Sequence, residues 1–478
     1  MASIGGHGNG TWGRTRRSTL IERKRSYNIK LEKKAKLLSL TKGKKFCLLS
    51  NVRDPSNIKN YIAYSLGEKV NIPYSVGLEF VSLYLNGHYN GLYLLTNKVQ
   101  LGKSNIDIPQ MDKDDRIEEL WQDGFKGSVD SDGGYAIDNA GAVKGGAKYS
   151  SNEDVSGGYL LDHCNHGFML NEAPSGFISK NGILIKIKEP KYAAPQEVEY
   201  IKNYYDETDV AVASSTGFNL TTGRHYSEYI DVESFVKYYI MQELLGNTDG
   251  GRGSFFMYKK PDELGGKLYA GPLWDFDNSL SYNEELFYIK SGFANHPNDY
   301  AGFLSELCKH DDFIKSVYST YESDIYPVVQ EFVSDSVFCS LCAFVTKETF
   351  FDNLRWPVGN REKVDEVVGR LNSRAEFLYH EWVDRGVNKY SVFVNSGMNL
   401  STSYYIYEYR IPVDSTYILP MLTDNNQHKY EFSGWIDNYN KPVTTITNEQ
   451  DSILVVGTWR KSFKPTVQYY FEKIKRLF

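Results

Sequence analysis

The segment from residue 247 to residue 277 decides how this chain of 478 residues is interpreted. It opens with the glycine-rich loop NTDGGRGS (247–254), continues with the strand-like run FFMYK (255–259), and ends, after a turn, with KLYAGPLWDFD (267–277). The second run predicts a strand that extends through Asp277 and returns along the first. Such a hairpin would bring Asp275 beside Asp249 and Ser254. The glycines would let the backbone of the loop approach a ligand closely.

Oxygen-bearing side chains at the two ends of this hairpin suit a magnesium ion held against substrate phosphates. Magnesium keeps several waters and takes few protein carboxylates, so two such ligands are enough. Other interpretations stay open. Asp249 can simply stabilise a glycine-rich turn, and Asp275 and Asp277 can share one surface face of a strand. The apolar residues around these two aspartates disfavour casual exposure. A carboxylate pair for glycoside hydrolysis is a third possibility, but the sequence does not fix the separation that this mechanism needs.

A second glycine-rich loop, GGHGNGTW (5–12), lies ahead of the predicted strand YNIKL (27–31). The loop can cover phosphates while Lys30 projects onto them from its strand, as in kinase-type nucleotide sites. It is not a Walker A loop, because no Gly-Lys-Ser/Thr follows. Taken alone, such a loop is more often a turn, a strand lysine is more often solvated, and His7 is more often a hydrogen-bonding residue than a ligand.

These segments form part of an ordered series of motifs that resembles the CotH family of atypical kinases. The matching motifs are GHGNGTW (6–12), RSYNIKL (25–31), LNGHYNGLYLL (85–95), GGYLLD (157–162), KEP (188–190) and GPLWDFD (271–277). Six motifs in order, within a domain placed at about residues 5–385, are far more specific than a single glycine loop.

The resemblance implies an α+β, two-lobed protein-kinase-like fold, with a β-rich N-lobe over 5–190 and a mainly helical C-lobe over 191–387. It implies transfer of the ATP γ-phosphate to Ser or Thr of an acceptor protein, with Mg²⁺ or Mn²⁺. Asp249 would be the catalytic aspartate. The metal would be bound by Asp275, Ser254 and Asp277, and the nucleotide by Lys30, Gly8, Asn9 and Lys188. Phosphoryl transfer depends mostly on positioning and charge neutralisation, which such side chains can provide.

Two positions depart from the family pattern. Asn97, followed by Lys98, stands where the family usually has an acid, and His7 stands where it usually has Arg. If the missing acid normally pairs with the phosphate-binding lysine, the orientation of Lys30 is in question. Three acids, Glu79, Asp162 and Glu189, are candidates to replace it. The alternative function is therefore a catalytically weak or dead kinase fold that serves as a structural or adhesion module of the cell envelope.

The charge distribution is uneven. The whole chain has a net charge of −6, whereas residues 1–50 contain 13 Lys and Arg against Glu22 and Glu32. A basic segment facing an acidic remainder suits a site that holds an anion beside a metal, although a solvated basic face is the simpler interpretation. The acidic balance excludes a general nucleic-acid binder. No apolar run reaches the length of a transmembrane helix, so we do not expect an integral membrane protein.

Cysteine usage and the N-terminus add two expectations. The five cysteines are too few and too scattered for a disulfide framework, and the lone pair Cys339 and Cys342 favours buried thiols over zinc. Residues 1–13 lack the apolar core of a secretory signal. We expect further residues upstream, including any signal, and an exported protein of the cell surface, the extracellular space or the spore coat.

Local patterns predict the other elements. An Asn-Gly pair at 86–87 predicts a hairpin between strands at 81–85 and 89–95. Further strands are predicted at 158–162 and 182–188, and a loop or insertion at 128–158. Asp231 and Gly246 are the expected caps of one helix. A second helix is predicted from Asn360 to Gly386, and helical structure over 300–350.

After Gly386 the sequence changes to short aromatic strands with frequent turns. The run YEFSGWID (430–437) and a late tryptophan, Trp459, resemble a repeat found in Listeria and Bacteroides surface proteins. This resemblance implies a small β-grasp or Ig-like module over 388–460, with a possible envelope partner, followed by a basic tail over 461–478. Trp435 and Trp459 are expected in its hydrophobic core.

Overall fold

The computed structural model describes most of the chain, in separate stretches. The described residues are 2–8, 12, 24–111, 121, 125–129, 135–139, 141–164, 167–247, 250, 251, 253–281, 302–357, 362–384, 389–395, 406–412, 417–419, 421, 430–437, 439–446 and 452–461. By their internal contacts, the residues divide into two compact units, Met1–Leu378 and Tyr379–Phe478.

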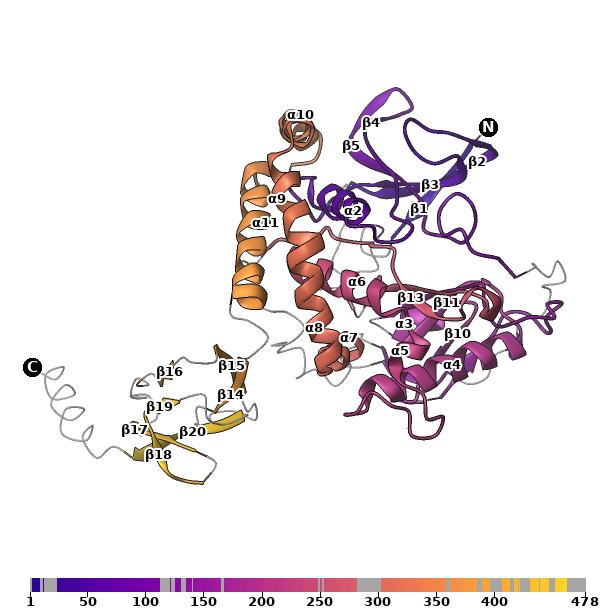
Figure 1. The fold of residues 1–478 in the computed structure, drawn as a ribbon. Coiled ribbons are helices and arrows are strands. Elements are labelled where there is room, and N and C mark those ends of the chain that lie inside the picture. The colour runs from indigo at the N-terminus through magenta and orange to yellow at the C-terminus, as the bar shows by residue number, and fades with distance from the viewer. Residues whose placement is uncertain are drawn as a thin grey trace, which may run out of the picture. The chain divides into compact units, whose positions relative to one another are not determined.

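The first unit begins with a five-stranded antiparallel sheet (Figure 1). Its order is β1 (Ala2–His7), β2 (Ser26–Ala35), β3 (Gly43–Leu49), β5 (His88–Asn97) and β4 (Leu78–Leu85). The hairpin predicted at Asn86-Gly87 is confirmed, and both residues have the positive φ of a tight primed turn, 50° and 81°. One face of this sheet packs as a core of five buried residues: Leu40, Phe46, Leu48, Tyr93 and Leu95.

A second, six-stranded antiparallel sheet follows in the same unit. Its order is β13 (Leu268–Ala270), β12 (Phe256–Lys259), β9 (Tyr159–His163), β11 (Leu184–Glu189), β10 (Gly176–Ile178) and β8 (Val143–Lys144). The chain on both sides of residue 190 contributes to this sheet, because β9 lies between β11 and β12. The six-stranded sheet therefore contains strands from both sides of the predicted boundary at residue 190.

Two predictions about strands are wrong. The stretch 128–158 is not simply a loop, because β8 lies within it and β6 (Gly127–Val129) pairs with β7 (Tyr135–Ile137). The strand expected to run through Asp277 ends at Ala270, and Trp274–Asp277 has irregular backbone. The second error arises because contacts with distant residues, rather than local alternation, fix the backbone at Asp275 and Phe276.

Helices pack around the six-stranded sheet, beginning with α4 (Pro195–Ala213), α5 (Tyr226–Tyr229) and α6 (Val232–Leu245). The caps predicted for α6 are confirmed. The Asp231 side chain accepts a hydrogen bond from the Ser234 N–H at 3.0 Å, and Gly246 ends the helix with φ 54°. Nearly every residue of α6 is buried, so this helix is surrounded by protein instead of burying one stripe. It contacts α2 (Lys59–Lys69), which follows β3.

The predicted helical character of 300–350 is confirmed by a chain of helices. These are α7 (Gly302–Leu307), α8 (Asp311–Thr320), the π-turn η3 (Tyr321–Ile325), α9 (Tyr326–Ser334) and α10 (Ser336–Arg355), followed by α11 (Val364–Tyr379) and the π-turn η4 (His380–Asp384). The N-cap expected at Asn360 lies outside the described residues. Within the described chain, no single helix is long and apolar enough to cross a bilayer, whereas the bent pair Asp311–Ser334 and Ser336–Arg355 meets both criteria jointly.

Helix α10 is attached to the five-stranded sheet by a buried ion pair. Lys24 Nζ lies 2.8 Å from Asp352 Oδ1, and both side chains are at least nine-tenths buried. The same carboxylate accepts the Leu92 N–H of β5 at 2.8 Å, and Trp356 Nε1 donates to the Asn90 carbonyl at 2.7 Å. Residues more than 250 positions apart are therefore joined through groups that would be costly to leave unpaired.

The second unit contains a mixed five-stranded sheet. Its order is β15 (Ile406–Pro412), β14 (Lys389–Asn395), β20 (Ser452–Lys461), β17 (Tyr430–Ile436) and β18 (Pro442–Val443), and β14 pairs with β20 in parallel. A second pair joins β16 (Tyr417–Ile418) to β19 (Thr445–Ile446). Trp435 is buried and Trp459 half-buried, and both pack edge-on against Phe432. Their place in this aromatic cluster fits the predicted structural role.

Candidate functional site

Asp275 lies on a segment whose backbone is held by helix α2. The Asp275 N–H donates to Tyr64 Oη at 3.0 Å, and the Phe276 N–H donates to Asn60 Oδ1 at 2.8 Å. Trp274 stacks on the Tyr64 ring with centroids 5.8 Å apart. Phe276 is fully buried, whereas Asp275 is exposed and has a left-handed backbone, φ 68°. An exposed carboxylate on a fixed, strained backbone is typical of a functional position.

The hairpin of β12 and β13 brings Ser254 to this carboxylate. Ala270 lies opposite Met257, and the Gly271 N–H donates to the Phe256 carbonyl, so the two chain ends leave the sheet side by side. Ser254 Oγ then donates to Asp275 Oδ2 at 3.1 Å. The approach of these two side chains was predicted from the sequence. Asp249, the third member of the predicted group, lies outside the described residues.

Asp277 also lies close to this group, although not for the reason predicted. The two aspartates were expected to share a face of one strand, but that strand is absent. Burial raises the pKa of Tyr64 well above its ordinary value, and the charges of Asp275 and Asp277 raise it further. The charges of both carboxylates therefore act on the Tyr64 hydroxyl, and Asp277 is half-buried.

The donor atoms suit a hard divalent cation. The Ser254 hydroxyl and the Asp275 carboxylate supply oxygen, which Mg²⁺ prefers, and this ion normally keeps waters in its remaining positions. Among the described residues, no group of three or more His, Cys, Asp or Glu side chains could hold a metal. The two oxygen donors fit a site in which the protein supplies few ligands and a substrate supplies others.

Basic side chains approach the same place from both sheets of the first unit. His7, at the end of β1, meets the Trp274 ring edge-on at 6.0 Å, and its Nδ1 lies 3.1 Å from Asn28 Oδ1. Burial, together with the positive charges of Lys98 and Lys188, lowers the pKa of His7 to about 4, although the hydrogen bond with Asn28 opposes the shift. His7 is therefore neutral at pH 7, and the charges of both lysines act on it. We call Ser254, Asp275, His7, Lys98 and Lys188 the Asp275 site.

Lys188 has the environment expected of a functional lysine. It projects from β11 with its Nζ 3.8 Å from Asp162 Oδ2 on β9, and the same oxygen contacts Lys186 Nζ at 3.0 Å. Its ammonium lies 5.6 Å from the centre of the Phe256 ring. Although 35% of its side chain stays exposed, burial lowers its pKa, and the Asp162 charge opposes this. The cation is held in place but not covered.

Asp162, one of the three acids considered as partners of Lys30, pairs instead with Lys186 and Lys188. It is buried, and its Oδ1 has no hydrogen-bond partner among the described residues. Glu79 instead accepts from the Ser39 N–H at 3.3 Å in an exposed contact. Of the three acids considered, Asp162 is the one with an ion pair to lysine in the described part of the chain. No local signal distinguished it, since the contact depends on the pairing of β9 with β11.

Asn97 does not affect Lys30 as the sequence comparison had suggested. Asn97 pairs with Phe46 across the sheet, and Phe46 pairs with Ile29, so Asn97 and Ile29 share a face. Lys30, the next residue, points to the opposite face because side chains alternate along a strand. Asn97 is buried and donates to the Thr41 carbonyl at 3.0 Å. An acid at position 97 would not have reached Lys30.

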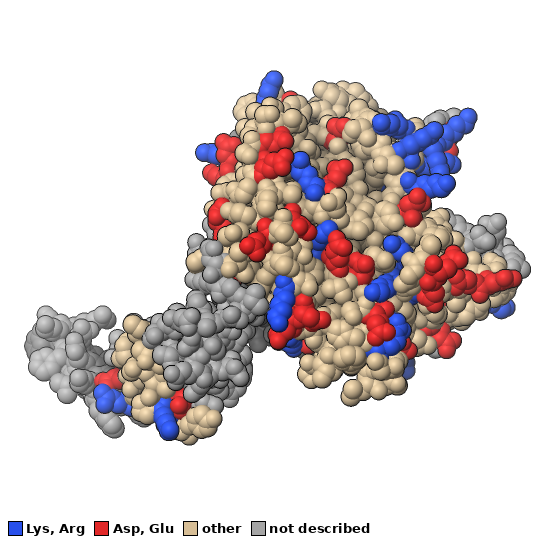
Figure 2. All heavy atoms as spheres, viewed as in Figure 1, with Lys and Arg blue, Asp and Glu red and all other residues tan. Residues whose placement is uncertain are grey.

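Lys30 itself is exposed and makes no ion pair within the described residues. It belongs to a row of exposed lysines on β2, β3 and their connection, visible as a blue group beside the N-terminal strands (Figure 2). We call this the basic hairpin; its lysines are Lys30, Lys33, Lys34, Lys36, Lys42 and Lys44. Gly8, after β1, has φ 77°, which favours glycine. Asn9 lies outside the described residues.

Comparison with known proteins identifies the family. A search of curated proteins found no match. The family model of the CotH kinase protein matches residues 6–372. This range includes the Asp275 site and every motif from the glycine loop to Asp277. A match over most of the chain is decisive for membership, and this protein therefore belongs to the CotH kinase family.

Proposed function

We propose that this protein is an ATP-dependent protein kinase that transfers the γ-phosphate to Ser or Thr of an acceptor protein, with Mg²⁺ or Mn²⁺. The observation that carries the proposal is the contact between Ser254 and Asp275 on a segment fixed by Tyr64 and Asn60. Oxygen ligands, together with the positive charges of Lys98 and Lys188 that act on His7 beside Trp274, suit a triphosphate with its metal.

Residues of the Asp275 site and its neighbours have separate roles in this proposal. Asp275 and Ser254 would bind the metal, with Asp277 close enough to assist, and Lys188 would contact phosphate oxygens. When bound, the metal would neutralise charge on the transferring phosphoryl group. Asp249 is proposed as the catalytic aspartate because it occupies the corresponding place in the family motif. Lys30, which the resemblance suggested for phosphate binding, has less support than Lys188 because it is exposed and has no ion pair among the residues that the structure describes.

We further propose that the acceptor is an exported protein of the cell surface or spore coat, and that the second unit binds an envelope partner. The mixed sheet with its Phe432, Trp435 and Trp459 cluster is compatible with the surface-repeat module that the sequence resembles.

The test is phosphate transfer from radiolabelled ATP, to the protein itself and to a mixture of candidate coat and surface proteins, with Mg²⁺ or Mn²⁺. Asp275→Ala should reduce labelling by about a hundredfold or more, because charge stabilisation of this kind is worth that much. Asp107→Ala, which removes an exposed carboxylate elsewhere, should leave labelling unchanged.

A thermal shift separates this proposal from a structural protein with a dead kinase fold. A nucleotide-binding kinase is stabilised by ATP with metal, since a ligand that binds only the folded state raises its melting temperature. If the wild-type protein shows no labelling and no stabilisation by ATP with metal, the structural alternative is favoured. Labelling that persists in Asp275→Ala would remove this residue from the mechanism.

A further inference from the structure

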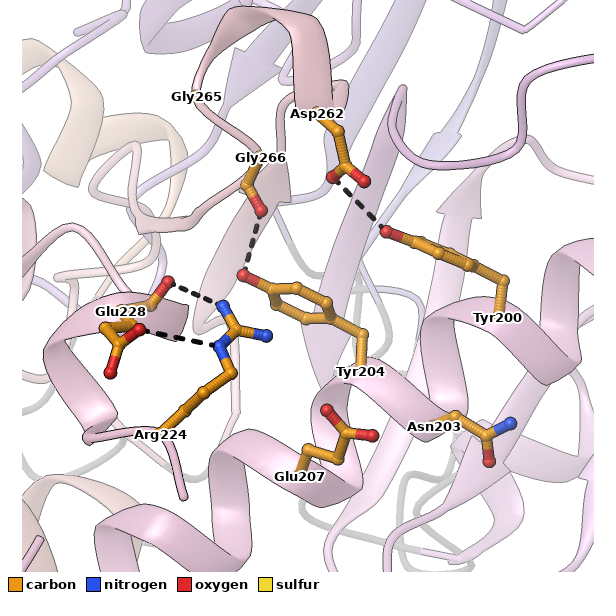
Figure 3. Close-up of a pocket in the computed structure, with 9 residues that line it drawn as sticks. All are labelled: Tyr200, Asn203, Tyr204, Glu207, Arg224, Glu228, Asp262, Gly265 and Gly266. Carbon is orange, nitrogen blue, oxygen red and sulfur yellow. Dashed lines mark hydrogen bonds and ion pairs between the residues drawn. The ribbon is translucent and has the colours of Figure 1, made fainter. Parts of the chain in front are cut away.

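A second candidate binding site lies at the opposite end of the β12–β13 hairpin from the Asp275 site. There the turn that contains η1 (Asp262–Leu264) meets α4 and α5 around a cavity of about 570 Å³, within the range of ligand sites. Figure 3 shows the side chains of these elements around one hollow. We call it the hairpin-tip pocket; its lining residues are Tyr200, Asn203, Tyr204, Glu207, Arg224, Glu228, Asp262, Gly265 and Gly266.

The floor of the pocket is built around a buried lysine. Lys259 is fully buried, and its Nζ donates to the Ser156 carbonyl at 2.7 Å and to Asp262 Oδ1 at 3.0 Å. The ammonium lies 4.3 Å from the centre of the Tyr204 ring, whose single O–H lies within hydrogen-bond distance of the Gly266 and Tyr229 carbonyls. The charge of Asp262 is thus already matched, and the aromatic floor is fixed by hydrogen bonds.

The two other carboxylates of the lining differ. Glu228 is paired with Arg224, whereas Glu207 has no partner among the described residues. Arg224 donates to the Glu228 carbonyl at 3.1 Å, and its Nε lies 3.8 Å from the Glu228 carboxylate. Its guanidinium also stacks 4.0 Å from the Tyr229 ring. Within the described residues, the side chains of Glu207 and Asn203 have neither a hydrogen bond nor an ion pair. In Figure 3 the Glu207 carboxylate points toward the hollow beside Arg224 and Tyr204.

This arrangement favours a ligand with one positive charge. Lys259 balances Asp262 and Arg224 balances Glu228, so the charge of Glu207 is left without an ion pair among the described residues. The turn beside it is open, because a Cβ placed on Gly265 would meet no atom within 4 Å. An extended chain could therefore run past the turn while a long cationic side chain enters the hollow and a backbone group meets Asn203.

We propose that the hairpin-tip pocket docks a lysine or arginine side chain of the acceptor protein; the identity of this partner rests on the proposed kinase function. The pocket is remote from the chemistry. Strand β12 spans about 10 Å from Phe256 to Lys259. Ser254 lies beyond its first end, and the turn of the pocket lies beyond its last. Because extended chain spans at most about 3.5 Å per residue, more than three residues must separate the docked cation from the phosphorylated hydroxyl.

The experiment measures peptide binding without nucleotide or metal. The probe is a capped nine-residue Gly/Ser peptide whose central lysine is its only charge, compared with a twin that carries glutamine there. Binding to the full chain is followed by ligand-observed NMR at low salt. The lysine peptide should bind about fivefold more tightly than its twin, the scale of one partly exposed ion pair. Glu207→Gln should remove that advantage.

Glu263→Gln is the matched control, since Glu263 is an exposed acid on the same turn but does not line the pocket. It should bind the lysine peptide as the wild type does. Equal binding of the two peptides by the wild type, or an undiminished preference in Glu207→Gln, would overturn the proposal. Asp275→Ala should keep the preference, so a failure of the proposed kinase activity is distinguishable from a failure of docking.

Discussion

The lysines of the basic hairpin and the lysines paired with aspartate are the same residue type in opposite environments. Lys30 and its neighbours are exposed on β2, β3 and their connection, whereas Lys24, just ahead of β2, is buried against Asp352. Lys188 lies between these extremes, paired with Asp162 but about one-third exposed.

The difference shows what each position can do. A solvated ammonium moves freely and is screened by salt, so it contributes little to a defined site. A fully buried pair supports structure but cannot reach a ligand. A lysine that is fixed by a carboxylate and still open on one side, as Lys188 is, can be presented to an anion in one geometry.

The largest effect is expected from the fully buried pair, in stability. Lys24→Met leaves the Asp352 carboxylate buried without its cation and should lower the free energy of unfolding by about 3–5 kcal/mol. Urea denaturation followed by circular dichroism measures this. Lys36→Met, in the basic hairpin, should change the same quantity by less than about 0.5 kcal/mol.

Adding Asp352→Asn to Lys24→Met should recover much of the loss, because the amide oxygen can still accept the Leu92 N–H while the buried charge is gone. If Lys24→Met and Lys36→Met lower the free energy of unfolding by the same amount, the difference in burial does not give these lysines different roles in stability.

The next effect is expected in catalysis. Lys188→Ala should lower kcat/KM for ATP by about a hundredfold, because it removes a preorganised cation from the phosphates. Lys30→Ala should lower it by less than about twofold, the scale of a solvated charge. Initial rates of labelling measure both, and ATP-dependent thermal stabilisation should disappear only in the first variant. An equal loss in both variants would restore the assignment of Lys30 that the family resemblance suggested.

The sequence predicted the elements that short-range chemistry determines. The β4–β5 hairpin depends on Asn86-Gly87, and α6 depends on its caps Asp231 and Gly246. The approach of Ser254 to Asp275 was also predictable, because a hairpin returns the chain to its starting point.

Other features depend on partners far away in the sequence. The backbone at Asp275 and Phe276 is fixed by Tyr64 and Asn60, more than 200 residues earlier. A prediction from strand alternation alone therefore continued β13 beyond Ala270, where the strand ends. Likewise, Lys30 and Lys188 both follow a strand pattern, and only the packing of β9 against β11 gives one of them an acid partner.

The smallest effect, and the sharpest test of the comparison, concerns Asp162. Asp162→Asn keeps the shape of the side chain but removes the charge that lies 3.8 Å from Lys188 Nζ. If Asp162 positions this lysine, the substitution should raise KM for ATP about tenfold and change kcat less, since removing a group that orients a ligand-binding side chain commonly costs that much. Adding it to Lys188→Ala should then have almost no further effect on KM.

Lys186→Ala is the control background, because Lys186 contacts the same Asp162 oxygen at 3.0 Å. There, Asp162→Asn should still raise KM. A general loosening of the sheet would instead lower the melting temperature and affect kinetics equally in both backgrounds. Such a result would make Asp162 a structural residue, and the contrast between Lys188 and the basic hairpin would then depend on exposure alone, without a positioning acid.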